Sequence, residues 1–166
     1  MKICVVSDSH KEIENLQKVI DRGDFDFLIH LGDDYCDLDE IKISKEFIRI
    51  PGVYDKEYFD KNIEKRIIKK FGEFRFLLTH TLNSHENDLK AGCEIKPEES
   101  YENLDQDAVD VVLFGHTHIP EISYNNKILF INPGHLKTVD QKGYEPSFII
   151  LDINNKLKIE SFKLKK

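Results

Sequence analysis

A short apolar run that ends in a glycine and two histidines constrains the fold of this chain most strongly. The run covers Val109–Phe114 and is interrupted only by Asp110. A continuous apolar run of this length is typical of a strand buried on both faces. Gly115 lets the chain leave that strand by a tight route, and His116 and His118 follow it. The segment therefore predicts a buried strand with two imidazoles beyond its carboxyl end.

The spacing of these two histidines suggests that they act together. Residues two apart in an extended segment point the same way. We therefore expect both imidazoles to face one spot beyond the strand, where open α/β sheets place their ligands. The alternative is a pair of solvent-facing loop histidines.

Composition limits the class of protein. The chain has 166 residues, 40% of them hydrophobic and 33% charged, which predicts one soluble globular domain over residues 1–166. The net charge of −7 argues against long nucleic acids as partners. The apolar stretch after Met1 ends at Val6, too short for a signal peptide or membrane span. Three scattered cysteines without a Cys-x-x-Cys motif favour a reducing compartment. We expect a cytoplasmic protein.

The first third of the chain alternates between strand and helix patterns. Strands are predicted at 2–6, 25–31 and 47–50, a helix at 11–22 that ends at Gly23, and a short helix or loop at 35–45. This order implies a parallel sheet with right-handed crossovers.

The rest of the chain is richer in hairpins. Strand pairs are predicted at 66–71 with 74–79, at 121–124 with 128–131, and at 147–153 with 156–163. Residues 83–106 are polar and irregular, with a helix predicted at Glu98–Leu104. The expected fold class is α/β: a two-sheet β-sandwich flanked by helices, in four layers α/β/β/α.

Four of the predicted strands end at carboxylates or imidazoles. The side chains concerned are Asp8 and His10, Asp33, His80, and His116 with His118. Parallel strands bring their carboxyl ends to one edge, so these six side chains can converge. Imidazole together with carboxylate favours Mn, Fe, Zn, Ni or Co over Mg or Ca. One carboxylate can bridge two metals about 3.5–4 Å apart.

Each of these residues also has an ordinary structural interpretation. Ser7, Asp8 or Ser9 could cap the following helix. Asp33 could belong to a simple turn, and His80 could be a buried histidine with its hydrogen bonds satisfied. The joint occurrence of these residues after four strands favours the metal site.

Five short motifs, in this order, resemble those of the calcineurin-like metallophosphoesterases. They are Ser-Asp-Ser-His (7–10), Leu-Gly-Asp-Asp (31–34), Leu-Thr-His (78–80), Phe-Gly-His-Thr-His (114–118) and Ile-Asn-Pro-Gly (131–134). The resemblance extends to about Leu151 and points to the small stand-alone phosphodiesterases of bacteria and archaea. It implies the two-sheet sandwich described above.

The resemblance also implies the roles of these residues. Two divalent transition metals, manganese first, would activate a metal-bound water to attack phosphorus in a small phosphate ester, a diester in preference to a monoester. The implied ligands are Asp8, His10 and His118 for the first metal, His80 and His116 for the second, and Asp33 as the bridge.

One motif departs from the family pattern. The fourth block usually reads Gly-Asn followed by two residues, and here it is Gly52-Val53-Tyr54-Asp55. That Asn normally binds the second metal and touches phosphate, which valine cannot do. The second metal would then take an extra water, recruit a carboxylate such as Asp34 or Asp55, or bind weakly. We expect it to bind with altered affinity.

The general acid is not assigned by the motifs. Tyr54 and His135 are the candidates, and His135 either faces phosphate or is a surface residue. His30 and His85 are interpreted as a core residue and a loop residue. Substrate specificity is expected in residues 83–106 and around Val53–Asp60.

A second interpretation is a catalytically weak or inactive protein of this fold that acts as a binding or scaffold module. The retromer subunit that resembles these enzymes is such a case. The missing Asn is a step in that direction, but all four expected histidines are present. Exposed β-edges are compatible with a homodimer.

Overall fold

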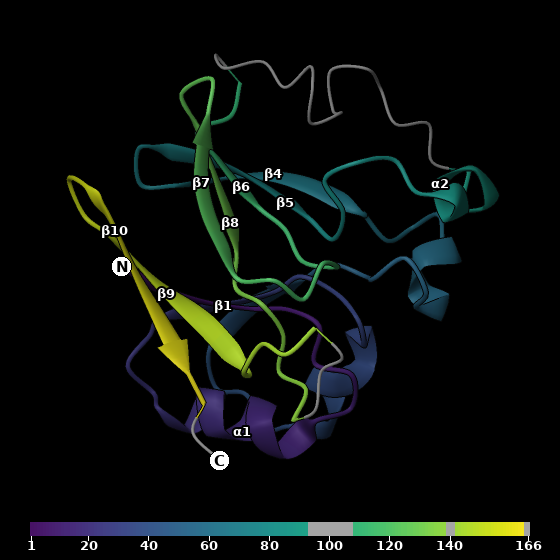
Figure 1. Ribbon diagram of the computed structural model, residues 1–166, viewed down its shortest axis with the longest axis horizontal. Helices are drawn as coiled ribbons and strands as arrows, with labels where there is room; N and C mark the ends of the chain where they lie inside the picture. Colours follow the sequence, from purple (N-terminus) through teal and green to yellow (C-terminus); the bar gives the residue numbers. More distant parts are fainter. Residues whose placement is uncertain (93–107, 139–141, 165–166) are drawn as a thin grey trace.

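Two mixed five-stranded sheets pack face to face in the computed structural model, which describes residues 1–92, 108–138 and 142–164 (Figure 1). The first sheet has the order β10-β9-β1-β2-β3 and the second β4-β5-β6-β8-β7. The strands of the first are β1 (Lys2–Val6), β2 (Phe27–His30), β3 (Glu46–Arg49), β9 (Ser147–Ile153) and β10 (Leu157–Lys163). Those of the second are β4 (Arg66–Phe71), β5 (Phe74–Thr79), β6 (Val111–Leu113), β7 (Glu121–Asn125) and β8 (Ile128–Asn132).

Both sheets combine parallel and antiparallel pairs of strands. Strands β1, β2 and β3 are parallel, as are β5, β6 and β8. The hairpin β9-β10 joins the first sheet because β9 pairs antiparallel with β1. The prediction of a sandwich of two sheets is confirmed. The second sheet contains two hairpins, β4-β5 and β7-β8, whereas the first contains one, β9-β10.

The alternation of strand side chains builds two apolar layers. Ile3 and Val5 of β1 face the second sheet and belong to the cluster between the sheets. Cys4 and Val6 face the opposite way and pack with the helix α1 (Ile13–Asp21). Strand β1 is therefore buried on both faces, as its continuous apolar run predicts.

Helix α1 is shorter than expected at its start. His10 and Lys11 have φ values of +48° and +66°, which a right-handed helix cannot contain. Glu12 precedes the first helical residue and makes no side-chain capping bond, so the capping interpretation of Ser7–Ser9 is wrong. Gly23 ends the helix as predicted, with φ +67° and its N–H bonded to the Ile20 carbonyl.

Three shorter helical segments complete the described structure. They are η1 (Tyr35–Glu40), η2 (Lys56–Phe59) and α2 (Glu86–Lys90). Segments η2 and α2 lie side by side (Figure 1), and the Tyr58 hydroxyl of η2 donates to the Asp88 carboxylate of α2. The helix predicted at Glu98–Leu104 lies outside the described residues. Among the described helices, none is long and apolar enough to cross a membrane.

Candidate metal centre

Four strand ends from the two sheets meet at one edge of the sandwich. The Asp8 amide donates to the Gly32 carbonyl at 2.8 Å, which joins the segments after β1 and β2. In the second sheet, the Gly115 amide donates to the His80 carbonyl at 3.0 Å, which joins the segments after β5 and β6. The predicted convergence of strand ends is therefore present in the structure.

The first group of candidate ligands comes from both sheets. Ligand atoms of Asp8, His10 and His118 all lie within 4.8 Å of one another. The Nε2 atoms of His10 and His118 are 3.0 Å apart, and His118 Nε2 lies 3.3 Å from Asp8 Oδ1. The other carboxylate oxygen of Asp8 accepts hydrogen bonds from the Ser7 hydroxyl and the His116 amide. These bonds fix the carboxylate so that Oδ1 faces the group.

The second group lies beside the first. It brings ligand atoms of Asp33, His80 and His116 within 4.8 Å of one another. His80 Nε2 is 3.5 Å from Asp33 Oδ2, and His10 Nε2 of the first group is 3.9 Å from the same oxygen. Asp33 therefore lies between the two groups, where a bridging carboxylate would have to be.

The two histidines of the Gly-His-Thr-His motif belong to different groups. The expectation of an extended segment is wrong: His116 has φ +66° and the Thr117 amide donates to the Gly115 carbonyl at 2.7 Å, which forms a γ-turn. The tight turn separates the imidazoles of His116 and His118, so one motif supplies both groups.

The backbone at the site is unusual for residues other than glycine. Five of the six candidate ligands have φ between +47° and +66°: Asp8, His10, Asp33, His116 and His118. Such left-handed conformations cost free energy and concentrate at functional sites. The surrounding hydrogen bonds hold them in place.

Two glycines are required by close approach at the site. A Cβ at Gly115 would lie 1.9 Å from Ser7 Oγ, and a Cβ at Gly52 would lie 1.7 Å from Asp33 Oδ1. Gly115 thus serves to let Asp8 and its neighbour approach the backbone, more than to turn the chain. Gly52 has the same relation to Asp33.

The electrostatics of the site favour positive charge. Burial lowers the pKa of His10 and of His116, which leaves both imidazoles neutral, the form that binds metals. Burial opposes protonation of His80 as well, but the nearby carboxylates of Asp33 and Asp8 raise its pKa to about 9. Without a metal, His80 therefore carries a proton, and its positive charge lies beside the carboxylates of Asp8 and Asp33.

The residues present fit a metal site. Among the described residues, the buried atoms without a hydrogen-bond partner are Asp8 Oδ1, Asp33 Oδ1 and His80 Nε2. Leaving such atoms unpaired is costly, and a cation would pair them. His80 Nδ1 lies 2.7 Å from the Leu31 carbonyl, an arrangement that orients a metal-binding imidazole and leaves Nε2 toward the metal.

Val53 does not face the candidate ligands. Its side chain is fully buried and packs with Tyr58 and Ala91, and its carbonyl accepts a hydrogen bond from the Asn87 side chain. The position at which the family has asparagine therefore contributes an apolar contact to η2 and α2.

The two carboxylates considered as substitutes lie on the rim of the site. Asp34 and Asp55 line a small cavity of about 110 Å³ together with His10, Asp33 and Tyr54. Asp55 Oδ2 accepts the amides of Gly52 at 2.6 Å and Tyr35 at 3.1 Å, and burial raises its pKa to about 6. Among the described residues, the two groups of close ligand atoms include neither Asp34 nor Asp55.

The two candidates for the general acid are placed differently. Tyr54 is 67% exposed, and its hydroxyl lies 3.4 Å from His85 Nε2. His135 is fully buried, so the surface interpretation is wrong. Its Nδ1 accepts the Lys137 amide and its Nε2 lies 3.1 Å from the Tyr144 carbonyl. His135 therefore packs beside His118 with both ring nitrogens bonded to backbone.

Sequence patterns did not reveal a buried hydrogen-bond chain under the first group. The Gly32 amide donates to His30 Nδ1, so His30 Nε2 carries the proton toward Ser9 Oγ at 2.8 Å. Ser9 in turn donates to Asp37 at 2.7 Å, and Asp37 also accepts the Lys11 amide. These hydrogen bonds fix the segment that carries Asp8 and His10. The Ser-Asp-Ser-His motif marks Ser9, but no local pattern marks His30 or Asp37.

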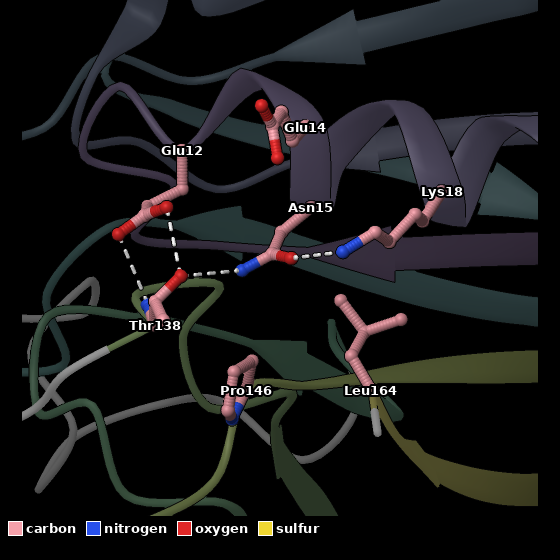
Figure 2. A pocket seen from close by; sticks show the side chains of 7 residues that line it. All are labelled: Glu12, Glu14, Asn15, Lys18, Thr138, Pro146 and Leu164. Carbon is pink, nitrogen blue, oxygen red and sulfur yellow. Dashed lines mark hydrogen bonds between the residues drawn. The ribbon is translucent and has the colours of Figure 1, made fainter. Parts of the chain in front are cut away.

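A cleft beside α1 is lined by residues that connect this helix to the segment of Asp8. Its volume is about 330 Å³, and its polar side chains bond to one another (Figure 2). Glu12 accepts the amide and hydroxyl of Thr138, while Asn15 donates to the Thr138 hydroxyl and the Leu136 carbonyl. The Leu136 amide donates to the Asp8 carbonyl. The cleft is thus a contact that ties α1 to the Asp8 segment.

The fold and the paired Asp/His groups together define a class of protein, a two-sheet α/β sandwich whose strand ends carry two groups of possible metal ligands. The chain belongs to the calcineurin-like phosphoesterase superfamily, whose sequence model matches residues 1–156. The resemblance noted in the motifs is confirmed.

Individual relatives agree with this family. The phosphodiesterase MJ0936 of Methanocaldococcus jannaschii is 28% identical over 152 residues, covering 81% of this chain and 83% of that protein. A solved archaeal phosphodiesterase superposes with a TM-score of 0.72 at 23% identity, covering 99% of this chain and 100% of the other. Vps29 of Chaetomium thermophilum superposes with a TM-score of 0.70 at 19% identity, covering 99% and 97%. These two structures show the fold.

Proposed function

We propose that this chain is a phosphodiesterase that hydrolyses small phosphate diesters at a site for two divalent metal ions, manganese first. The observation that carries the proposal is the pair of Asp/His groups with their buried, unpartnered ligand atoms. In the proposed site, Asp8, His10 and His118 would hold one ion, His80 and His116 would hold the other, and Asp33 would be shared between them. When bound, such ions supply Lewis acidity and a nucleophile at neutral pH.

The hydrolysis adds one water to the diester. The water oxygen bonds to phosphorus, the bond from phosphorus to the leaving alcohol oxygen breaks, and that alcohol takes one proton while the second is released. The protein's part is to hold the ligands rigidly, as the bonds of Asp8 to Ser7 and His116 do.

The rim of the site favours a diester over a monoester. Asp34 and Asp55 line the cavity beside His10 and Asp33. A monoester brings two negative charges close to these carboxylates, whereas a diester brings one, and like charges repel.

The free thiols of Cys4 and Cys36 are consistent with the cytoplasmic location that we propose.

The experiment compares bis-p-nitrophenyl phosphate with p-nitrophenyl phosphate on metal-stripped protein titrated with Mn, Ni, Zn and Mg. We expect turnover that requires a transition metal and is faster for the diester. Asp33→Asn should abolish it, while Asp152→Asn should not, because Asp152 pairs with Lys2 at the opposite end of β1. Equal turnover without metal would contradict the proposal.

A second function is a binding module without catalysis. The observation that favours it is the burial of Val53 away from the candidate ligands, since the second group then has three protein ligands. Metal binding without turnover of either ester would make this function the better account.

A further inference from the structure

The second ligand group adjoins a cavity that the proposed metal centre does not use. The cavity has a volume of about 270 Å³ and is formed by Thr81–His85 and Phe114–Thr117. Of the six candidate ligands, only His116 is among the described residues that line it. Pockets for whole small molecules are commonly ~300–1,000 Å³, so this cavity suits one part of a substrate.

The chemistry of the cavity wall differs from that of the acidic rim. Thr81, Asn83, Ser84 and Thr117 supply hydroxyl and amide groups, and the described residues that line it include no aspartate, glutamate, lysine or arginine. The small cavity of about 110 Å³ described above is lined by three carboxylates, those of Asp33, Asp34 and Asp55. An uncharged group with hydroxyls finds partners in the first cavity, whereas the second favours a cation.

His85 presents a hydrogen-bond donor between these two cavities. Its Nδ1 accepts the Asn87 amide at 3.2 Å, so in the neutral ring the proton is on Nε2. The ring lies edge-on to His116, with centroids 5.7 Å apart, and edge-on to Tyr54 at 5.4 Å. The contact from Nε2 to the Tyr54 hydroxyl is long, 3.4 Å, and an anionic oxygen would be a stronger acceptor.

The backbone bonds of this segment fix the position of His85. The His85 amide donates to the Asp88 carboxylate while its side chain caps α2. Asn87, which precedes that aspartate, donates its side-chain N–H to the Val53 carbonyl. The block that lacks the family asparagine is therefore tied directly to the segment that carries His85.

We propose that His85 is a substrate-binding residue, and that the cavity formed by Thr81–His85 and Phe114–Thr117 takes an uncharged, hydroxyl-bearing alcohol part of a phosphodiester. His85 Nε2 donates to a non-bridging oxygen of the phosphate, and the cavity contacts the attached sugar-like or polyol group. The inference rests on the proposed phosphodiesterase function and names its substrate class.

The test uses two chromogenic diesters that differ in the attached group. These are the p-nitrophenyl ester of thymidine 5′-phosphate, which is uncharged beyond the phosphate, and p-nitrophenylphosphorylcholine, which carries a cation. We expect the manganese-loaded protein to show a kcat/KM at least tenfold higher for the thymidine ester. A preference for the choline ester would overturn the assignment of the cavity.

The variant His85→Asn removes the imidazole but retains a good helix cap. We expect it to lower kcat/KM for the thymidine ester by about tenfold to a hundredfold, the range for a hydrogen bond to a charged group, with unchanged metal content. Leu89→Ala on the same helix is the control, because Leu89 is 82% exposed. Unchanged kinetics, or loss of bound metal, would overturn the role of His85.

Binding separates this inference from the proposed function. If the protein hydrolyses neither ester, calorimetry can still compare the binding of thymidine 5′-phosphate, in the presence of manganese, by the native chain and by His85→Asn. Binding by the native chain that weakens about tenfold or more in His85→Asn supports the substrate contact. Absence of binding, or equal binding by both, rejects it.

Discussion

Two of the candidate ligands, Asp8 and His80, are oriented by bonds to neighbouring backbone or side-chain groups. Asp8 uses one oxygen to accept from Ser7 and His116, and the other faces His118. His80 uses Nδ1 toward the Leu31 carbonyl and leaves Nε2 toward Asp33. Such supporting contacts fix the direction of a ligand before the metal arrives. The site is therefore sensitive to changes of a single atom near these contacts.

The substitution Gly52→Ala should disrupt the site more than the fold. The added Cβ would lie 1.7 Å from Asp33 Oδ1, so the carboxylate or the segment after β3 must move. We expect a loss of about 1–3 kcal/mol in stability and at least a hundredfold loss of diester hydrolysis. Urea denaturation and the p-nitrophenyl ester assay measure the two effects. Gly143→Ala is the control for activity: a Cβ there meets no atom within 4 Å, so hydrolysis should be retained, although the φ of +80° costs this variant about 1 kcal/mol of stability. Full activity of Gly52→Ala would contradict the close contact.

His30 should make stability depend on pH in the acidic range. Complete burial lowers its pKa from 6.5 to about 4, against the opposing charge of Asp8. Between pH 6.5 and pH 4, His30 is protonated in the unfolded chain but not in the native protein. Its contribution to the free energy of unfolding therefore decreases as the pH falls through this range. This contribution is on the order of 3 kcal/mol.

The variant His30→Gln isolates this contribution. It cannot titrate, so we expect its free energy of unfolding to fall less steeply than that of the native chain between pH 6.5 and pH 4. Urea denaturation at several pH values with a chelator present gives both curves. Because the variant loses the bonds to Ser9 and Gly32, its stability at pH 7.5 should be lower. Parallel curves would show that His30 does not titrate as its burial requires.

The loop after β3, the segment η2 and the helix α2 pack together around Val53. Val53, Tyr58 and Ala91 make a cluster of their own. Restoring the family asparagine by Val53→Asn would place an amide among these apolar side chains. We expect this variant to lose about 1–3 kcal/mol of stability, the cost of a buried polar group without a partner, and to gain no activity.

Val53→Thr is a suitable control for this change, because it adds a polar atom at nearly constant volume. A thermal melt and the diester assay on both variants decide the matter. An increase in rate for Val53→Asn, with the melting temperature maintained, would show that the side chain at position 53 can turn toward the metals.

Strand positions were predictable from the sequence because burial on both faces leaves continuous apolar runs. The buried strands Lys2–Val6 and Ser147–Ile153 have the predicted bounds. So does the hairpin of Arg66–Phe71 and Phe74–Thr79, which was predicted from the turn between the two strands. The start of α1 was not predictable, because the left-handed conformations of His10 and Lys11 arise from contacts between segments. The segment from Gly115 to His118 shows the same limit.

The grouping of the six candidate ligands followed from the topology of parallel strands and from the family motifs. The supporting residues did not, because they come from distant parts of the chain. His30, Ser9 and Asp37 are joined through one buried hydroxyl. His85 lies beside His116, and the helix that follows it, α2, is bonded to the Val53 carbonyl. Local patterns carry no trace of such contacts.

At the scale of the whole molecule, the candidate centre joins the two sheets. Asp8, His10 and Asp33 follow strands of the first sheet, while His80, His116 and His118 follow strands of the second. Each ligand group contains residues from both sheets. A metal bound at either group therefore links the two halves of the sandwich, and unfolding of either half would release it.

Metal binding should raise the stability of the entire fold. A ligand that binds only the native state at a thousand times its Kd adds about 4.1 kcal/mol, which for a chain of this size is a rise in Tm of roughly 8–16 °C. We expect addition of manganese to chelator-treated protein to produce a rise of this order in calorimetry. Asp33→Asn should reduce the rise most, because Asp33 lies between the groups, whereas His118→Asn, which removes a ligand from one group, should retain part of it. Identical melts with and without metal would reject a metal centre between the sheets, and an equal loss in both variants would reject the bridging position of Asp33.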